Sequence, residues 1–154
     1  MPDTKTAILP DLHVLLVDDD ELFLKMAQAM LGALGVKHVT TATNGSDAFA
    51  KLAKTPRVVD VVLCDYSMDA GNGLQLLQSI RTGAIKLIRP DICFILLTAS
   101  GDHSVVEAAA QLDTNGYLMK PVTPTSLQNA IVKARSRAVK VDFARYSSVV
   151  VPAH

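Results

Sequence analysis

Apolar and polar positions follow two different patterns along most of the chain. Short, mostly apolar runs occur at residues 12–17, 39–42, 58–64, 92–97 and 117–119. Runs of this length predict β-strands, and runs that are apolar at nearly every position are typical of parallel sheets covered on both faces. The pattern therefore predicts five strands.

Between these runs, apolar residues recur at helical spacing. The first helix has the stripe Phe23, Met26, Ala27, Met30, Leu31 and Leu34, with Gly35 as its stop. This stripe leaves Leu24 on the outward face. Further helices are predicted after Asn44 as far as Pro56, over 74–80 and 105–112, and from Pro124 onwards with Thr123 as N-cap.

The alternation gives five β-α pairs, which predicts an α/β protein with a parallel sheet and helices on both faces. The expected fold is the flavodoxin-like doubly wound (βα)5 arrangement with strand order 2-1-3-4-5. We divide the chain into an N-terminal extension, 1–11, one domain, 12–138, and a C-terminal tail, 139–154. The tail is unusually apolar, so we weigh a disordered end against an edge strand over 147–151.

Composition narrows the function. Lysine and arginine number 15, as do aspartate and glutamate, and this balance argues against a basic nucleic-acid binder. Apolar residues make up 49% of the chain, which excludes a disordered acidic protein. Cys64 and Cys93 lie in apolar runs and form no zinc motif, so we expect reduced thiols. We read no signal peptide and no membrane segment, and therefore expect a cytoplasmic protein.

Chemically active side chains stand at four of the five strand ends. Asp18 and Asp19 follow the first strand, Asp65 ends the third, Thr98 ends the fourth and Lys120 ends the fifth. Ligands of open parallel sheets bind beyond the carboxyl ends of the strands, where the winding direction reverses. We therefore expect these residues to converge on one site.

Clustered carboxylates repel one another unless a cation compensates. Three carboxylates, one Mg²⁺ and Lys120 would sum to zero charge, and Mg²⁺ prefers oxygen ligands. A carboxylate beside a metal and a lysine is placed to attack phosphorus and form an aspartyl phosphate. The Thr98 hydroxyl and the Lys120 ammonium would then bind phosphoryl oxygens.

Five stretches together resemble the receiver domain of bacterial two-component response regulators of the chemotaxis-regulator type. They are residues 14–20, 61–68, 71–74, 95–99 and 116–121. The resemblance implies the following roles: Asp65 as phosphoacceptor; Asp18, Asp19, Asp65 and the backbone carbonyl of Ser67 as Mg²⁺ ligands; Thr98 and Lys120 as phosphoryl-binding groups; Tyr117 as an aromatic switch; and a cis peptide bond before Pro121.

The resemblance also implies the partners. The protein would take a phosphoryl group from a sensor histidine kinase or a histidine phosphotransfer protein, and would then switch a surface for a downstream protein target. We expect docking of the donor on the outward face of the first helix, and a signalling phosphoacceptor rather than an enzyme. We expect no output domain, no direct nucleic-acid contact and no membrane insertion, and we leave a homodimer open.

Two positions depart from the family pattern. Asp69 stands where the family usually has proline, which puts the rigidity of the loop and the metal affinity in question. Val122 stands where the family usually has phenylalanine.

Three alternatives remain at this point. A haloacid-dehalogenase-type enzyme would use Asp18 as nucleophile, but it leaves Asp65 unexplained. A flavodoxin would place phosphate beside three aspartates, which would repel it. A degenerate receiver that acts only as an interaction scaffold is the third.

Overall fold

The computed structural model describes residues 9, 11–55, 57–68, 72–99 and 102–152. The strands are β1 (His13–Val17), β2 (His38–Ala42), β3 (Val61–Asp65), β4 (Cys93–Thr98) and β5 (Gly116–Met119). The helices are α1 (Glu21–Ala33), α2 (Gly45–Leu52), α3 (Gly73–Arg81), α4 (His103–Gln111), α5 (Pro124–Arg135) and α6 (Phe143–Ser148).

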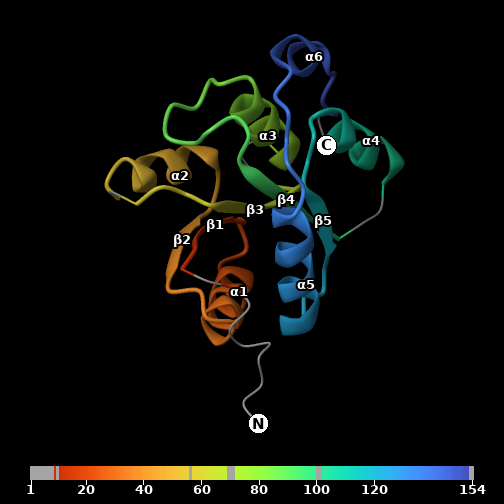
Figure 1. Ribbon diagram of the computed structural model, residues 1–154. Coiled ribbons are helices and arrows are strands. Elements are labelled where there is room, and N and C mark those ends of the chain that lie inside the picture. The colour runs from red at the N-terminus through yellow and green to blue at the C-terminus, as the bar shows by residue number, and fades with distance from the viewer. Residues whose placement is uncertain (1–8, 10, 56, 69–71, 100–101, 153–154) are drawn as a thin grey trace.

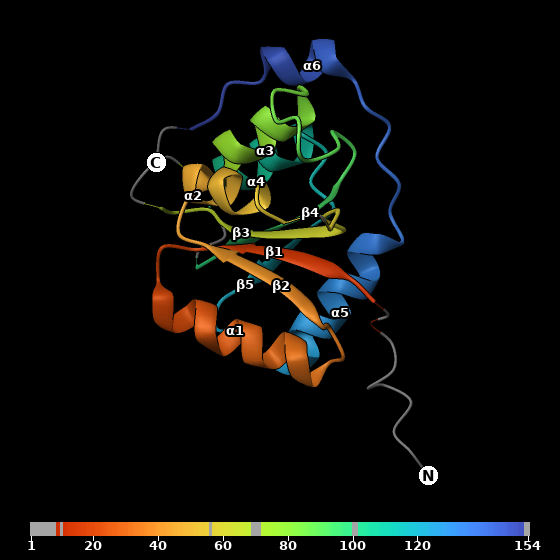
Figure 2. The same cartoon turned by 90° about the vertical axis from the view of Figure 1, so that its left-hand side faces the viewer.

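The five strands form one parallel sheet in the order β2-β1-β3-β4-β5, which confirms the predicted topology (Figure 1). Helices α1 and α5 cover one face, and α2, α3 and α4 cover the other (Figure 2). All five carboxyl ends therefore lie along one edge of the sheet, where the predicted site residues stand.

The two faces of the sheet carry separate apolar clusters. Leu15 and Val17 pack with α2, α3 and α4, whereas Val14 and Leu16 pack with α1 and α5. Side chains alternate between the faces of a strand, so a strand covered on both sides is buried at every position. Every residue of β1 and of β3 is buried, as predicted.

Helix α1 is rotated relative to the prediction. Its buried residues are Leu24, Ala27 and Leu31, whereas Met26 is 51% exposed. The predictions that Met26 faces the core and Leu24 faces outward were wrong. The first turns are apolar at nearly every position, so two neighbouring stripes were compatible with the sequence. The Asp20 side chain caps the helix by accepting from the backbone N–H of Leu22 and of Phe23.

Within the described residues, the C-terminal tail is helical at Phe143–Ser148 and adds no strand to the sheet, so the predictions of a disordered end and of an edge strand in the chain's own sheet were wrong. It forms α6, which packs on α3. Phe143, Tyr146 and Val149 are spaced by three, which is helical rather than strand spacing. Tyr146 is completely buried, and the Asp142 side chain accepts from the Arg145 N–H to start the helix.

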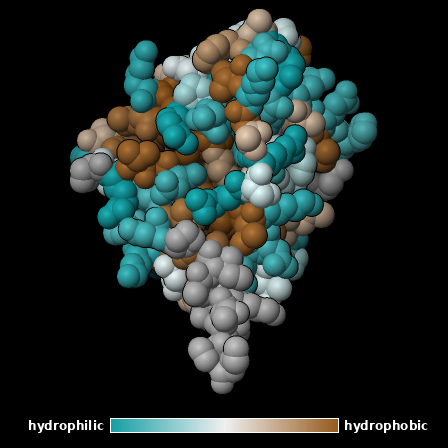
Figure 3. All heavy atoms as spheres, viewed as in Figure 1, coloured by the Kyte–Doolittle hydropathy of each residue, from teal (hydrophilic) through white to brown (hydrophobic). Residues whose placement is uncertain are grey.

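Both cysteines are free thiols, as expected. Among the described residues, no helix is long and apolar enough to cross a membrane. The surface in Figure 3 is mixed, with apolar side chains gathered at the left over α2, where Phe49 is 36% exposed. Some apolar exposure is ordinary for a folded domain.

Candidate functional site

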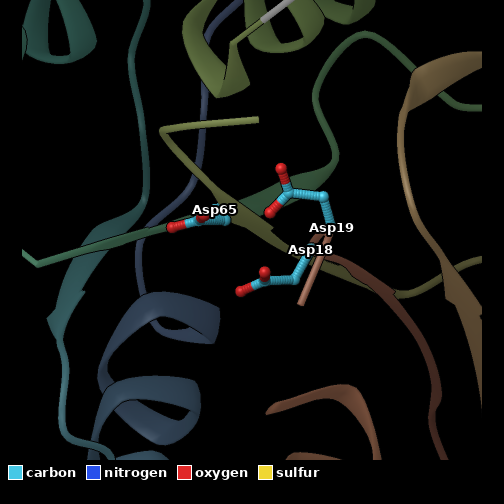
Figure 4. A group of neighbouring side chains, drawn as sticks. All are labelled: Asp18, Asp19 and Asp65. Carbon is cyan, nitrogen blue, oxygen red and sulfur yellow. The ribbon is translucent and has the colours of Figure 1, made fainter. Parts of the chain in front are cut away.

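Three carboxylates converge at the edge formed by the carboxyl ends of β1 and β3. Figure 4 shows Asp18 and Asp19 directly after β1, facing Asp65 at the end of β3. One carboxylate oxygen from each residue lies within 4.8 Å of the others. Asp18 is completely buried and Asp65 is 7% exposed. The predicted convergence at the switch point of the sheet is therefore confirmed.

The backbone around Asp18 explains why its side chain points into the site. Its N–H donates to the Ala42 carbonyl at 3.0 Å, which extends the pairing of β1 with β2 by one residue. Its Oδ1 accepts from the Asp20 N–H at 2.9 Å, which turns the chain towards α1. These two contacts fix the direction of the carboxylate, which joins those of Asp19 and Asp65.

Lys120 brings a positive charge to the cluster from the end of β5. Its Nζ lies 2.6 Å from Asp18 Oδ2 and 3.4 Å from Asp65 Oδ1. Its backbone N–H donates to the Thr98 carbonyl at 2.9 Å, which joins the ends of β4 and β5. The peptide bond between Lys120 and Pro121 is cis, as the resemblance implied.

Phe23 is a site residue that sequence reasoning missed. Its ring centroid lies 4.2 Å from Lys120 Nζ, which is a cation–π contact. The helical pattern assigned this residue to the core stripe of α1. An aromatic residue in the first turn after the paired aspartates was the only available signal, and spacing alone could not separate the two roles.

The charge balance of the site perturbs two titrating groups. Burial and then the neighbouring charge of Asp18 raise the pKa of Asp65 to about 6, although Lys120 counteracts this. Burial by itself would lower the pKa of Lys120, but the hydrogen bond to Asp18 and the charges of Asp65 and Asp18 raise it overall. This environment therefore destabilises the ionised form of Asp65 relative to the protonated form.

The residues present fit a divalent cation. Three carboxylates and one lysine leave a net charge of about −2 when all are ionised, and a hard divalent ion would neutralise it. All the ligand atoms are oxygens, which suits Mg²⁺ better than a softer transition metal. Asp18 and Asp19, directly after β1, and Asp65, at the end of β3, are the side chains that would hold it.

A pocket of about 320 Å³ opens directly beside Asp65. It is lined by Asp65, Tyr66, Ser67, Thr98, Ala99, Asp102, Val105 and Lys120. The pocket thus brings together the predicted phosphoacceptor, Asp65, and the residue whose backbone carbonyl is a predicted Mg²⁺ ligand, Ser67. The two predicted phosphoryl-binding residues, Thr98 and Lys120, also line it. Thr98, which ends β4, is 6% exposed.

Tyr117 is not among the residues that line this pocket. It lies on β5 with 37% of its surface exposed, and its hydroxyl donates to the Val106 carbonyl of α4 at 2.8 Å. The ring therefore bridges β5 and α4 in an outward position. An inward movement of the ring is the change that the resemblance implies.

The start of α3 lies against the backbone of the predicted phosphoacceptor. A Cβ at position 73 would lie 2.5 Å from the Asp65 carbonyl oxygen, so glycine is required there. The Gly73 N–H donates to the Tyr66 carbonyl at 2.8 Å. Asp69, the departure from the family pattern, lies outside the described residues, and the expectation about the loop stays a prediction.

Comparison with known proteins defines the class. Residues 14–132 match the response regulator receiver domain, so the chain belongs to this family. A probable chemotaxis protein CheY from Rhizobium etli is 33% identical over 125 residues, which cover 81% of this chain and 93% of that protein. The transcriptional regulatory protein GlrR from Escherichia coli is 32% identical over 139 residues, which cover 90% of this chain and 30% of that protein.

Solved structures agree. The chemotaxis protein CheY4 of Vibrio cholerae superposes with a TM-score of 0.69 at 25% identity, over 81% of this chain and 99% of that one. A response regulator receiver domain protein from Clostridium thermocellum superposes with a TM-score of 0.68 at 29% identity, over 81% and 94%. Receiver domains are signalling phosphoacceptors of two-component systems rather than conventional enzymes. Membership of this family therefore argues against the dehalogenase-type and flavodoxin alternatives.

Proposed function

We propose that Asp65 accepts a phosphoryl group from the phosphohistidine of a sensor histidine kinase or a histidine phosphotransfer protein. Mg²⁺ would be held by Asp18, Asp19, Asp65 and the backbone carbonyl of Ser67. One observation carries this proposal. The three carboxylates lie within 4.8 Å of one another, and Lys120 is paired with two of them.

The reaction is a displacement at phosphorus. An Asp65 carboxylate oxygen forms a P–O bond while the bond from phosphorus to the histidine nitrogen breaks, and the nitrogen keeps the electron pair. Bound Mg²⁺ supplies positive charge that stabilises the charge on the transferring oxygens. Hydrolysis then returns the carboxylate when water attacks phosphorus and the aspartyl oxygen leaves.

The other residues of the pocket bind and orient the group. The Lys120 ammonium, which already lies 3.4 Å from Asp65, pairs with a phosphoryl oxygen. The Thr98 hydroxyl donates a hydrogen bond to another oxygen. Both groups are positioned before the reaction, since one ends β4 and the other follows β5.

The signal would leave through the surface formed by α4, β5 and α5. Phosphorylation adds roughly −1.5 to −2 charge at the end of β3. Movement of Thr98 towards this charge opens space that Tyr117 can enter after it leaves the Val106 carbonyl. The altered surface then binds a downstream protein target.

We also propose that the phosphodonor docks on the exposed face of α1, next to the site. The correction to the rotation of α1 changes which residues form this face. Leu22 is 67% exposed and Met26 is 51% exposed, and with Ala29 they form an exposed apolar line at helical spacing. Exposed apolar groups rimmed by polar ones mark protein contacts. Action in the cytoplasm, where histidine kinases present their phosphohistidine, is part of the same proposal.

Small-molecule phosphorylation tests the function without a known partner. Incubation with Mg²⁺ and acetyl phosphate should add one phosphoryl group per chain. EDTA and the substitution Asp65→Asn should each abolish labelling, whereas Asp91→Asn, on the loop before β4, should leave it intact. Absence of labelling in a folded wild-type protein would favour the degenerate, scaffold-only alternative.

A further inference from the structure

The part of the chain described beyond the five β-α pairs packs along α3 and reaches Asn72, next to the functional site, at Pro152. Figure 2 shows α6 lying over α3, after which the chain runs back towards the edge where the strands have their carboxyl ends. We call residues 149–152 the C-terminal strap. At the opposite end, α6 is fixed by Asp113, whose carboxylate accepts from the Tyr146 hydroxyl at 2.6 Å and pairs with Arg145.

Two amide side chains of α3 and its N-cap hold the strap by its backbone. Gln78 Nε2 donates to the carbonyls of Tyr146 and Val149, each at 2.9 Å. Asn72 Nδ2 donates to the Pro152 carbonyl at 2.7 Å. Asn72 is 5% exposed and Val149 is 9% exposed, while Val151 packs against the apolar cluster of the α3 face. The contact is therefore partly buried and specific in geometry.

Asn72 also starts α3. Its Oδ1 accepts from the Gln75 N–H at 3.0 Å, and its own N–H donates to Gln75 Oε1 at 2.8 Å. The next residue, Gly73, contacts the backbone of Asp65 and donates to Tyr66. Two consecutive residues thus link the end of the strap to the backbone of the phosphoacceptor.

We propose that the C-terminal strap holds the start of α3 against Asp65, so that Asn72 is a positioning residue for the phosphorylation site. The proposal rests on the proposed function, because it concerns ligand binding at that site. Tyr66 and Ser67 lie between Asp65 and Asn72 in the sequence and line the pocket. Ordering this backbone before the ligand arrives lowers the entropic cost of binding. Loss of the strap should therefore weaken binding of Mg²⁺ and of the phosphoryl mimic beryllofluoride.

Three variants of the full chain separate this role from general stability. Deletion of 149–154 removes the strap but keeps α6. Asn72→Ser keeps an N-cap acceptor and removes the amide donor to Pro152. Arg145→Gln is the matched control. It weakens the ion pair that attaches α6 to Asp113, but it leaves the hydrogen bond between Asn72 and Pro152 in place. The readouts are Mg²⁺ affinity by calorimetry and, without metal, hydrogen exchange of the Gly73 amide.

The deletion and Asn72→Ser should each weaken Mg²⁺ binding about fivefold, the lower end of typical coupling between sites. Each should also speed hydrogen exchange of the Gly73 amide. The variant that combines both changes should bind Mg²⁺ no more weakly than either single variant. Arg145→Gln should lower the melting temperature with little change in Mg²⁺ affinity. By reciprocity, Mg²⁺ should slow exchange in the strap of the wild-type protein.

Unchanged or tighter Mg²⁺ binding in the deletion would overturn the proposal. So would additive losses in the double variant, or an equal loss in Arg145→Gln. A wild-type protein that does not bind Mg²⁺ would refute the proposed function instead. In that case, exchange at Gly73 in the metal-free variants still decides whether the strap holds the start of α3.

Discussion

Lys120 lies nearer to Asp18 than to Asp65, the proposed phosphoacceptor, with Nζ–Oδ distances of 2.6 and 3.4 Å respectively. Asp18 is completely buried, and in the part of the chain that the structure describes Lys120 is its ion-pair partner. In the absence of a metal, the lysine is therefore the counter-charge of the acidic cluster.

This ion pairing predicts that the protein loses stability when the charge of Lys120 is removed. Lys120→Met should lower the free energy of unfolding by about 1–3 kcal/mol in EDTA, because an unpaired buried carboxylate remains and the site is partly open to solvent. Lys120→Arg, which keeps the charge, should lose less. Mg²⁺ should restore part of the loss. Urea unfolding measures all three, and a Lys120→Met protein as stable as wild type would contradict the assigned pairing.

The raised pKa of Asp65 predicts how stability depends on pH without metal. Burial and the charge of Asp18 raise this pKa from 3.8 to about 6, so the folded protein binds more protons than the unfolded chain between these values. Stability should therefore be highest below about pH 4 for this group and fall as pH rises through about 6, by at most about 3 kcal/mol.

The matched variant isolates that dependence. Asp65→Asn cannot ionise, so in EDTA the difference in unfolding free energy between wild type and variant should grow in favour of the variant as pH rises from about 4 to about 7. Unfolding by urea at the two pH values suffices. A difference that does not change with pH would show that Asp65 titrates normally in the folded protein.

The contact of Phe23 with Lys120 predicts a contribution to phosphoryl binding. Phe23→Leu should weaken beryllofluoride binding about two- to fivefold, which corresponds to a cation–π contact of about 0.5–1 kcal/mol. Phenylalanine analogues at position 23 with increasing ring fluorination keep the shape of the ring but weaken its negative face. The affinity for beryllofluoride should therefore fall with each added fluorine. Met30→Leu, on the same helix, serves as control. Affinity that is independent of fluorination would assign Phe23 to packing alone.

Removal of α6 should destabilise the domain. Truncation after Lys140 removes Tyr146, which is completely buried, and should cost about 3–5 kcal/mol, as for other large-to-small changes in a core. Tyr146→Phe keeps the ring and loses the hydrogen bond to Asp113, so about 1–2 kcal/mol is expected. Thermal unfolding measures both. A truncated protein with the wild-type melting temperature would show that α6 is not docked in solution.

The success and failure of sequence-based prediction in this protein have physical causes. The sheet order and the convergence of Asp18, Asp65 and Lys120 were predictable, because parallel strands bring their carboxyl ends to one edge whatever the loops do. The rotation of α1 about its axis was not predictable. Apolar residues form two overlapping stripes on this helix, so the sequence does not decide which stripe faces the core. Only the packing of Leu24 against the core resolves it.

The tail shows a second limit. Its apolar residues were recognised, but the partners of the tail lie on α3 and in the loop after α4, far away in the sequence. Tyr146 pairs with Asp113, and Gln78 binds two tail carbonyls. Long-range polar contacts of this kind leave no periodic signal in a single sequence. The same reason explains why the contact of Phe23 with Lys120 was not predicted, whereas its packing against the core was.

Chemical mapping of the phosphoryl group tests the central claim most directly. Borohydride reduces an acyl phosphate to an alcohol, so a phosphorylated aspartate becomes homoserine and can be located by peptide mass spectrometry. After incubation with Mg²⁺ and acetyl phosphate, we predict homoserine at position 65, and none there when EDTA is present. Homoserine at position 18 or 19, with Asp65 unmodified, would contradict the assignment of Asp65 as the phosphoacceptor.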